Sequence, residues 1–288
     1  MYSITQVEAD IVFIEYQCKK NQVALIDGTG LSKLITDCRA AISNNTTGHI
    51  NLWPLTVLYT LAESLKTLWL KEVDFKTQLK SMNSGSLAYG SKDGPQEHYF
   101  KDFEFEIFSA AQLVKDGVEV VLPQQTEGED LIVNDIHVQC KHPSTVNQID
   151  TLLRDFNSRL NDTKKYGVFG IAVEDCMNYP SDKEFSSVDE FHQVMDDVEM
   201  RVEKEQQKIF EDRLAASTRI LGMYTMASFF VKIKGNAARM MRLSNAVFCF
   251  RHDRKEIKDA DYKRAYRLLS TFNSSPSWLT IVDGKLVK

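Results

Sequence analysis

Apolar and polar positions recur with two different periods along this chain, and together they predict an α/β protein. Residues 11–26 alternate as two strands would around a polar turn at Lys19–Asn21, and residues 51–73 have the apolar content of a helix. Residues 81–96 are rich in Gly and Ser, which is typical of a linker. We therefore expect an N-terminal α/β unit over residues 1–95.

The pattern becomes regular after this linker. Residues 99–116 carry apolar side chains at helical spacing and stop before Gly117, a common helix end. The next segments read as a strand, a hairpin with Asn134-Asp135 at its tip, a helix and a strand, at residues 118–122, 130–141, 149–160 and 166–175. We expect this order of helix, three strands, helix and strand to form a core over residues 96–180.

The remaining residues, 181–288, are expected to add helix and strands to this core. Ser187 and Glu190 have the spacing of a capping box and predict a helix that runs to about residue 218. The last predicted elements are two strands and a helix, at residues 220–233, 245–250 and 259–272.

Composition is that of an ordinary globular chain, but charge is distributed unevenly. The 288 residues are 43% hydrophobic and 26% charged, and the formal net charge of −5 does not suggest a general coat of nucleic acid. Residues 232–267 hold eleven Lys and Arg against four acids, a local charge of +7 that leaves −12 elsewhere. This stretch could hold a phosphate backbone, or it could be a solvated helix face with pairs such as Asp259–Lys263.

Cysteine spacing and hydropathy exclude several other classes of protein. The five cysteines form no CxxC pair and no zinc-site spacing, so we expect reduced, buried thiols. The apolar runs are shorter than the roughly 20 residues that span a bilayer, and the N-terminus lacks a basic start followed by an apolar stretch. We expect a cytoplasmic protein with no membrane partner.

Polar residues recur on one face of the predicted hairpin. If the turn is Asn134-Asp135, Asp130 lies opposite Gln139, and alternation places Lys141 on the same face. Opposed Cβ atoms in a hairpin are about 5 Å apart and diagonal ones roughly 7 Å, so these three side chains would form a cluster. The other face is apolar and is expected in the core: Leu131, Val133, Val138 and Cys140.

The chemistry of this cluster suits a divalent metal ion. The Asp130 carboxylate, the Gln139 amide oxygen and the Cys140 backbone carbonyl are the hard ligands that Mg²⁺ prefers, with Mn²⁺ as a substitute. A water on such an ion is acidic enough to attack phosphorus, and Lys141 could orient it or stabilise charge on the phosphoryl oxygens. The preceding helix offers two further acids, Glu104 and Glu106.

The motifs, taken in order, resemble the PD-(D/E)xK nucleases, the restriction-endonuclease-like superfamily. Its core runs helix, strand, Asp-bearing strand, strand ending in (Glu or Gln)-x-Lys, helix, strand. Phe105-Glu106, GEDLIV at residues 128–133 and VQCK at residues 138–141 look most like the Mrr-type restriction branch, which spells these positions FE, GxDLI and VQxK. The resemblance covers residues 99–174 and implies a mixed central sheet flanked by helices.

The resemblance implies a role for each residue of the cluster. Asp130 would be the acidic metal ligand, Gln139 would replace the second acid, and Lys141 would be the motif lysine. Glu106 would be the helix glutamate, chosen over Glu104 by the family's spacing alone. Two features depart from the family, because an acidic residue replaces the proline before Asp130, and Gln139 removes one negative charge from the ion site.

Other polar residues allow more than one interpretation. A second QCK, at residues 17–19, has no preceding helix or partner Asp, so we interpret it as the exposed face of a strand. His137 and His142 could touch substrate or tune the attacking water, although lone histidines are more often structural. The predicted nucleic-acid contacts are Lys141, His142, Arg239, Arg242, Arg251 and Arg254.

These features predict a Mg²⁺-dependent nuclease that hydrolyses phosphodiester bonds in DNA. The resemblance implies restriction or another defence against foreign DNA, a double-stranded substrate, and a homodimer or a defence-system protein as partner. The long helix from residue 187 is a candidate seam for such a partner. Two alternatives stay open: a nuclease-like module that binds nucleic acid or a protein without cutting, and a nuclease for RNA or single strands.

Overall fold

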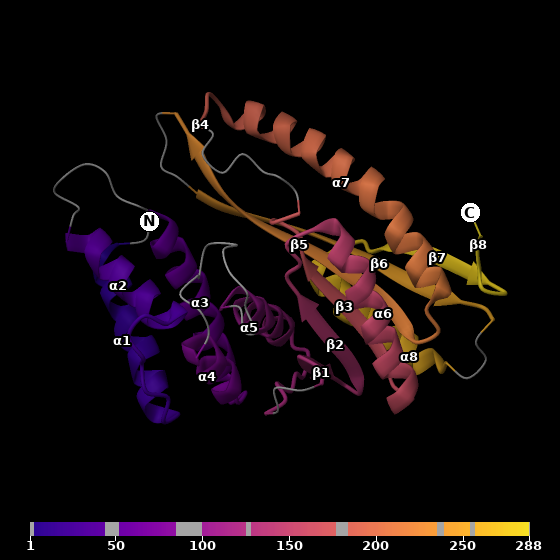
Figure 1. Cartoon of the computed structure of the whole chain (residues 1–288), viewed down its shortest axis with the longest axis horizontal. Coiled ribbons are helices and arrows are strands. Elements are labelled where there is room, and N and C mark those ends of the chain that lie inside the picture. Colours follow the sequence, from indigo (N-terminus) through magenta and orange to yellow (C-terminus); the bar gives the residue numbers. More distant parts are fainter. Residues whose placement is uncertain are drawn as a thin grey trace. The chain divides into compact units, whose positions relative to one another are not determined.

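The protein is described by a computed structural model over residues 3–43, 52–84, 100–124, 128–176, 184–234, 239–253 and 257–287 (Figure 1). Its internal contacts divide the chain into two units, Met1–Leu131 and Ile132–Lys288, and each is described by itself. Among the described helices, none combines the length and the apolar character needed to cross a membrane.

The first unit is built from helices that pack on one another. Their bounds are α1 Ile4–Lys20, α2 Gly30–Ser43, α3 Leu52–Leu70, α4 Lys76–Ser84 and α5 Phe100–Lys115. Helix α3 contacts α1, α2 and α5, and α4 packs on α2 and α5. Fully buried side chains from each helix form the core, among them Ile14, Leu34, Leu61, Leu79 and Leu113.

The predicted strands at residues 11–26 are wrong, because this segment belongs largely to α1. Ser3 caps the helix: its hydroxyl accepts from the Gln6 N–H at 3.3 Å, and the Gln6 side chain accepts from the Ser3 N–H at 2.8 Å. The buried side chains of α1 recur at helical spacing, at Val7, Ile11, Ile14 and Cys18. In the described residues, the N-terminal unit is therefore helical instead of α/β.

The predicted strand at residues 118–122 is also wrong in its extent. Only Val121 forms a bridge, and its described neighbours belong to no strand. Helix α5 ends as expected before Gly117, whose φ of +74° closes the helix. Within the described residues the core order is therefore helix, two strands, helix and strand, one strand fewer than expected.

The second unit is organised around an eight-stranded mixed sheet in the order β1-β2-β3-β5-β6-β7-β8, with β4 paired to β5 off this path. The strands are β1 Leu131–Val133, β2 Ile136–Lys141, β3 Tyr166–Ala172, β4 Glu184–Phe185, β5 Ile220–Ile233, β6 Arg239–Arg251, β7 Ser277–Val282 and β8 Lys285–Val287. Neighbours β2, β3 and β5 are parallel, whereas β5 and β6 are antiparallel.

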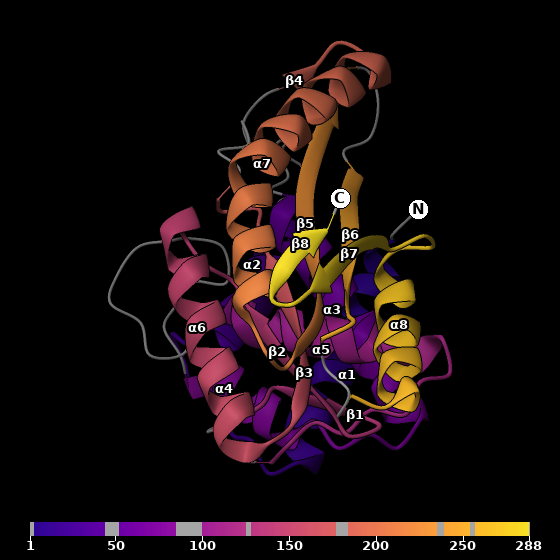
Figure 2. The same ribbon diagram turned by 90° about the vertical axis from the view of Figure 1, so that its right-hand side faces the viewer.

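Helices cover both faces of this sheet (Figure 2). Helices α6 (Val146–Thr163) and α7 (Val188–Ala216) lie on one face, and α8 (Asp259–Phe272) lies on the other. On the α6 face Phe156 meets Phe169 with ring centroids 5.5 Å apart, and on the α8 face Phe272 stacks on Tyr224 at 3.8 Å. The expectation of a mixed sheet flanked by helices is confirmed at this level.

The predicted hairpin is confirmed. Asn134 and Asp135 have φ values of +48° and +71°, the positive pair that a two-residue type I′ turn requires. Arg264 of α8 donates to the Asn134 carbonyl at 3.3 Å and holds the turn. The apolar face lies in the core as expected, with exposed fractions of 0% to 1% for Leu131, Val133, Val138 and Cys140.

All five cysteines are free thiols, as predicted. Four are buried and Cys176 is partly buried. Burial, with a smaller contribution from Glu15, raises the pKa of the Cys18 thiol to about 11. Burial likewise raises the pKa of Cys38 and of Cys249 to about 12, so these thiols stay protonated at neutral pH.

Candidate functional site

The carboxyl end of β2 carries the polar residues that the sequence singles out. Strands β2 and β3 pair in parallel, with Gln139 beside Phe169 and Lys141 beside Ile171. Phe169 and Ile171 belong to the core under α6, so Gln139 and Lys141 share that face, which we call the polar hairpin face. Half-buried His137 lies on it as well. Ligands of parallel sheets commonly bind outside such strand ends.

Gln139 is paired with a cation that sequence reasoning missed. Its side chain is only 2% exposed, and its Oε1 accepts a hydrogen bond from Nη2 of Arg159 on α6. The Arg159 guanidinium also lies over the Phe156 ring, 5.9 Å from the centroid. The oxygen expected to bind Mg²⁺ therefore accepts from a positive charge, which would repel a second cation at the same atom.

Two expected site residues, Glu106 and Asp130, belong to the first unit. Glu106 on α5 is 4% exposed, and Gln78 of α4 donates to its Oε2 at 3.4 Å. Glu104 is half-buried on the same helix, and Asp130 is half-buried directly before β1. Gln139, Cys140 and Lys141 all lie on β2 in the second unit.

His142 lies between two acids that sequence reasoning did not select. It follows β2, and its Nε2 is 3.3 Å from Glu174 Oε1 while its Nδ1 is 3.7 Å from Asp175 Oδ2. The His142 side chain is 5% exposed. The signal for these acids was their position directly after a buried strand, beside the end of β2. His142, Glu174 and Asp175 therefore form one polar cluster beside the end of β2.

The ligands predicted for Mg²⁺ are chemically suited to the ion, but one of them, the Gln139 amide oxygen, already accepts a hydrogen bond from Arg159. Carboxylates at Asp130 and Glu106, the Gln139 amide and the Cys140 carbonyl are all oxygen ligands of the kind Mg²⁺ prefers. Within the residues that the structure describes, no three His, Cys, Asp or Glu side chains gather as they would around a metal. The metal ligands therefore stay a prediction.

Arg251 has a structural role, which corrects its assignment as a nucleic-acid contact. It is 3% exposed, and its Nη1 donates to three carbonyls at the end of α7, those of Leu214, Ala215 and Ser217. These bonds place its charge in the core. Arg242 is half-buried and donates to Ser228 Oγ at 3.0 Å. The Arg239 side chain and Arg254 lie outside the described residues.

Asp253, the acid beside Arg251, should contribute to stability in a pH-dependent way. Burial works to raise its pKa, but the Gly284 N–H at 2.8 Å and the Arg251 guanidinium outweigh it and hold that pKa below its usual range. Because the pKa is lower in the folded state, the stabilisation is present above the unfolded value of about 3.9 and is lost as pH falls through the folded value.

Asp253→Asn is therefore expected to flatten the loss of stability in acid. The free energy of unfolding of the variant should fall less than that of the unchanged protein between about pH 5 and pH 2. Urea titrations at several pH values measure this difference. The matched control is Asp283→Asn, which changes an exposed acid in the turn between β7 and β8. Parallel acid profiles for Asp253→Asn and the unchanged protein would contradict the expectation.

Comparisons with known proteins assign no family to this chain. No protein-family model matches it, and no curated protein matches it. A solved structure of a CdiA-CT/CdiI toxin and immunity complex from Burkholderia pseudomallei is similar over 52% of this chain and 93% of that chain, with 13% identity and a TM-score of 0.25. The class that the fold itself defines is a mixed α/β protein with a helical N-terminal unit.

Proposed function

We propose that this protein is a metal-dependent nuclease that hydrolyses phosphodiester bonds in DNA. The observation that carries the proposal is the β1–β2 hairpin, whose type I′ turn sets the alternation along both strands. This alternation puts Gln139 and Lys141 on one face at a carboxyl strand end. Asp130 precedes the hairpin at the spacing of the PD-(D/E)xK motif.

Each residue has a defined task in this proposal. Mg²⁺, or Mn²⁺ in its place, would supply an acidic water for attack on phosphorus. The Asp130 and Glu106 carboxylates would hold the ion together with the Cys140 carbonyl, and the Gln139 amide would join them once its bond to Arg159 is broken. The Lys141 ammonium would stabilise charge that develops on the phosphoryl oxygens.

The biological setting is part of the same proposal. The resemblance to restriction enzymes suggests defence against foreign DNA, with double-stranded DNA as the substrate. A homodimer, or a complex with a defence-system protein, would give each strand of a duplex its own site. Sedimentation with and without DNA would measure whether one or two chains assemble.

A second candidate is a module that binds nucleic acid or a protein without cutting it. The contact between Arg159 and the Gln139 amide oxygen favours it, because this cation lies where the resemblance expects a metal. In that case Arg159 and Lys141 would supply the positive charge that attracts phosphate. An RNA or single-strand nuclease is distinguished from either candidate by substrate alone.

The test incubates the full chain with supercoiled plasmid, linear DNA or RNA, in Mg²⁺, Mn²⁺ or EDTA. We expect DNA to be nicked or linearised in both metals and to stay intact in EDTA, because the attacking water depends on the ion. Cleavage that persists in EDTA would contradict the proposal, and cleavage of RNA alone would replace it with the RNA nuclease. Binding of DNA without cleavage under every condition would support the non-cutting module.

A further inference from the structure

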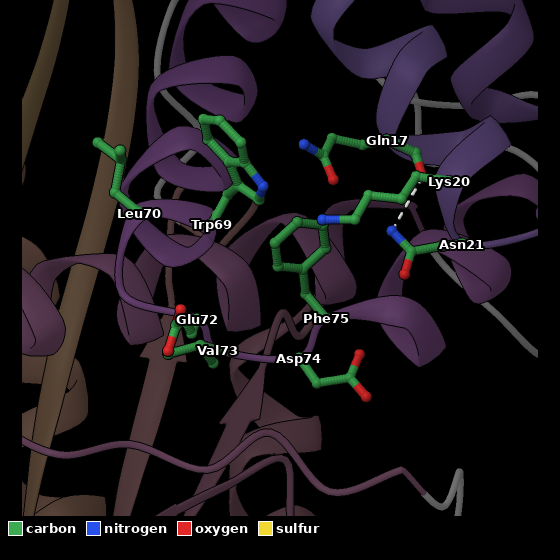
Figure 3. A pocket seen from close by; sticks show the side chains of 9 residues that line it. All are labelled: Gln17, Lys20, Asn21, Trp69, Leu70, Glu72, Val73, Asp74 and Phe75. Atoms are coloured by element: carbon green, nitrogen blue, oxygen red, sulfur yellow. Dashed lines mark hydrogen bonds between the residues drawn. The ribbon is translucent and has the colours of Figure 1, made fainter.

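A pocket with a volume of about 530 Å³ lies in the first unit, beside the C-terminal ends of α1 and α3 (Figure 3). Small-molecule sites commonly measure about 300–1,000 Å³. The α1 side contributes Gln17, Lys20 and Asn21, and the α3 side contributes Trp69 and the segment that follows it. The pocket is lined by no residue of the polar hairpin face, so a ligand here would serve a different purpose.

Gln17 offers a buried donor to this pocket. Its side chain is 1% exposed, and its Nε2 has no hydrogen-bond partner within the part of the chain that the structure describes. Figure 3 shows the amide directed into the space bounded by Trp69, Lys20 and Phe75. Buried donors in native proteins nearly always meet an acceptor, so an unmet one calls for an explanation such as a bound water, ion or ligand. A ligand with an acceptor atom would satisfy it.

Trp69 supplies a flat apolar surface beside a positive charge. Trp69 is 41% exposed, and Phe13 braces it edge-on with ring centroids 6.0 Å apart. The Lys20 Nζ lies 6.0 Å from the centroid of the Trp69 ring, and Phe75 is 4% exposed. An aromatic ring on a ligand could stack on this surface while an anionic group meets Lys20.

Two carboxylates complete the lining on the other side of Phe75. Glu72 and Asp74 belong to the segment between α3 and α4, and Figure 3 shows both away from Gln17. Asp74 already accepts from the Lys76 N–H at 3.0 Å, which anchors this segment at the start of α4. Their remaining acceptor positions suit hydroxyl or amino groups and would repel a second anionic group on the ligand.

We propose that this pocket binds a free nucleoside monophosphate. One such molecule carries a flat ring for Trp69, acceptor atoms for Gln17, a phosphate for Lys20, and ribose hydroxyls for Glu72 or Asp74. The inference goes beyond the proposed nuclease and does not depend on it, because its readout is binding to the intact chain. A protein that cuts no DNA would still bind the nucleotide.

The experiment titrates the full chain with AMP, GMP, CMP and UMP by calorimetry. We expect saturable binding of at least one of them, with one site per chain. Trp69→Ala should weaken it about tenfold through lost stacking, and Lys20→Ala should weaken it by a similar factor. Gln17→Leu should also weaken it about tenfold without lowering the melting temperature, because it removes a buried donor that lacks a partner.

The chain offers matched controls on α1. Lys19→Ala and Tyr16→Ala remove an exposed lysine and an exposed aromatic that do not line the pocket, so affinity should stay within about twofold. Trp69 and Lys20 are exposed, so their variants should fold. They keep the test decisive even if Gln17→Leu fails to fold. Three outcomes would overturn the proposal: no saturable binding of any monophosphate, binding indifferent to Lys20 and Trp69, or binding of oligonucleotides but not mononucleotides.

Discussion

Lys141→Ala is expected to lower the rate of metal-dependent DNA cleavage by about 100- to 1,000-fold, the usual cost of removing one group that stabilises charge in a transition state. Lys141 lies on β2 two residues after Gln139, on the same face of the sheet. The substitution removes an ammonium group and none of the predicted metal ligands. Initial rates of plasmid nicking at saturating Mg²⁺ measure the effect.

Asp130→Asn separates the role of the lysine from that of the metal. The amide keeps the shape of the side chain but removes the negative charge, so the variant should require more Mg²⁺ for half-maximal rate, whereas Lys141→Ala should not. Glu129→Gln and Lys165→Ala are the matched controls, since they remove a neighbouring acid and an exposed lysine before β3. Cleavage that survives both Asp130→Asn and Lys141→Ala would exclude the proposed site.

The elements that could be predicted from the sequence have signals within a few residues of one another. The hairpin follows from Asn134-Asp135 between apolar runs, and α7 follows from its cap, where Ser187 accepts from the Glu190 N–H at 3.1 Å. Strand β5 and helix α8 have the predicted bounds, residues 220–233 and 259–272. Local turn and cap chemistry decided each of these cases.

The N-terminal prediction failed because two periods fit the same residues. Glu15, Gln17 and Lys19 alternate as a strand would, yet α1 buries Gln17 and exposes Lys19. The capping pair Ser3 and Gln6 was the signal that would have favoured the helix. The same kind of signal was missed at Asp283-Gly284, a two-residue turn that joins β7 to β8.

The partners of charged side chains could not be predicted, because tertiary packing decides them. Arg159 reaches Gln139 because α6, which connects the parallel strands β2 and β3, packs on the face of the sheet that carries Gln139. The sequence shows only the local net charge of residues 232–267. This stretch contains both half-buried Arg242 and fully buried Arg251. Net charge along a sequence does not distinguish a phosphate contact from a cation that stabilises the core.

Arg251→Met is expected to lower the free energy of unfolding by about 3–5 kcal/mol, the usual cost of breaking a buried, charged network by removing one member. Methionine fills much of the space of the arginine stem but donates no hydrogen bond. Three carbonyls at the end of α7 would lose their donor, and a helix C-terminus carries partial negative charge that a cation stabilises. Asp253 would also lose a nearby positive charge, since its Oδ1 lies 3.5 Å from Arg251 Nε.

Urea unfolding followed by circular dichroism measures this loss, and two further variants identify its cause. Arg242→Met removes a half-buried arginine from the same strand, whose Nε donates to Ser228 Oγ, and should cost clearly less than Arg251→Met because its side chain keeps more contact with water. Asp253→Asn in the Arg251→Met background should recover part of the loss, because it removes the uncompensated acid. If Arg251→Met and Arg242→Met were equally stable, Arg251 would not be what holds the end of α7 to the sheet.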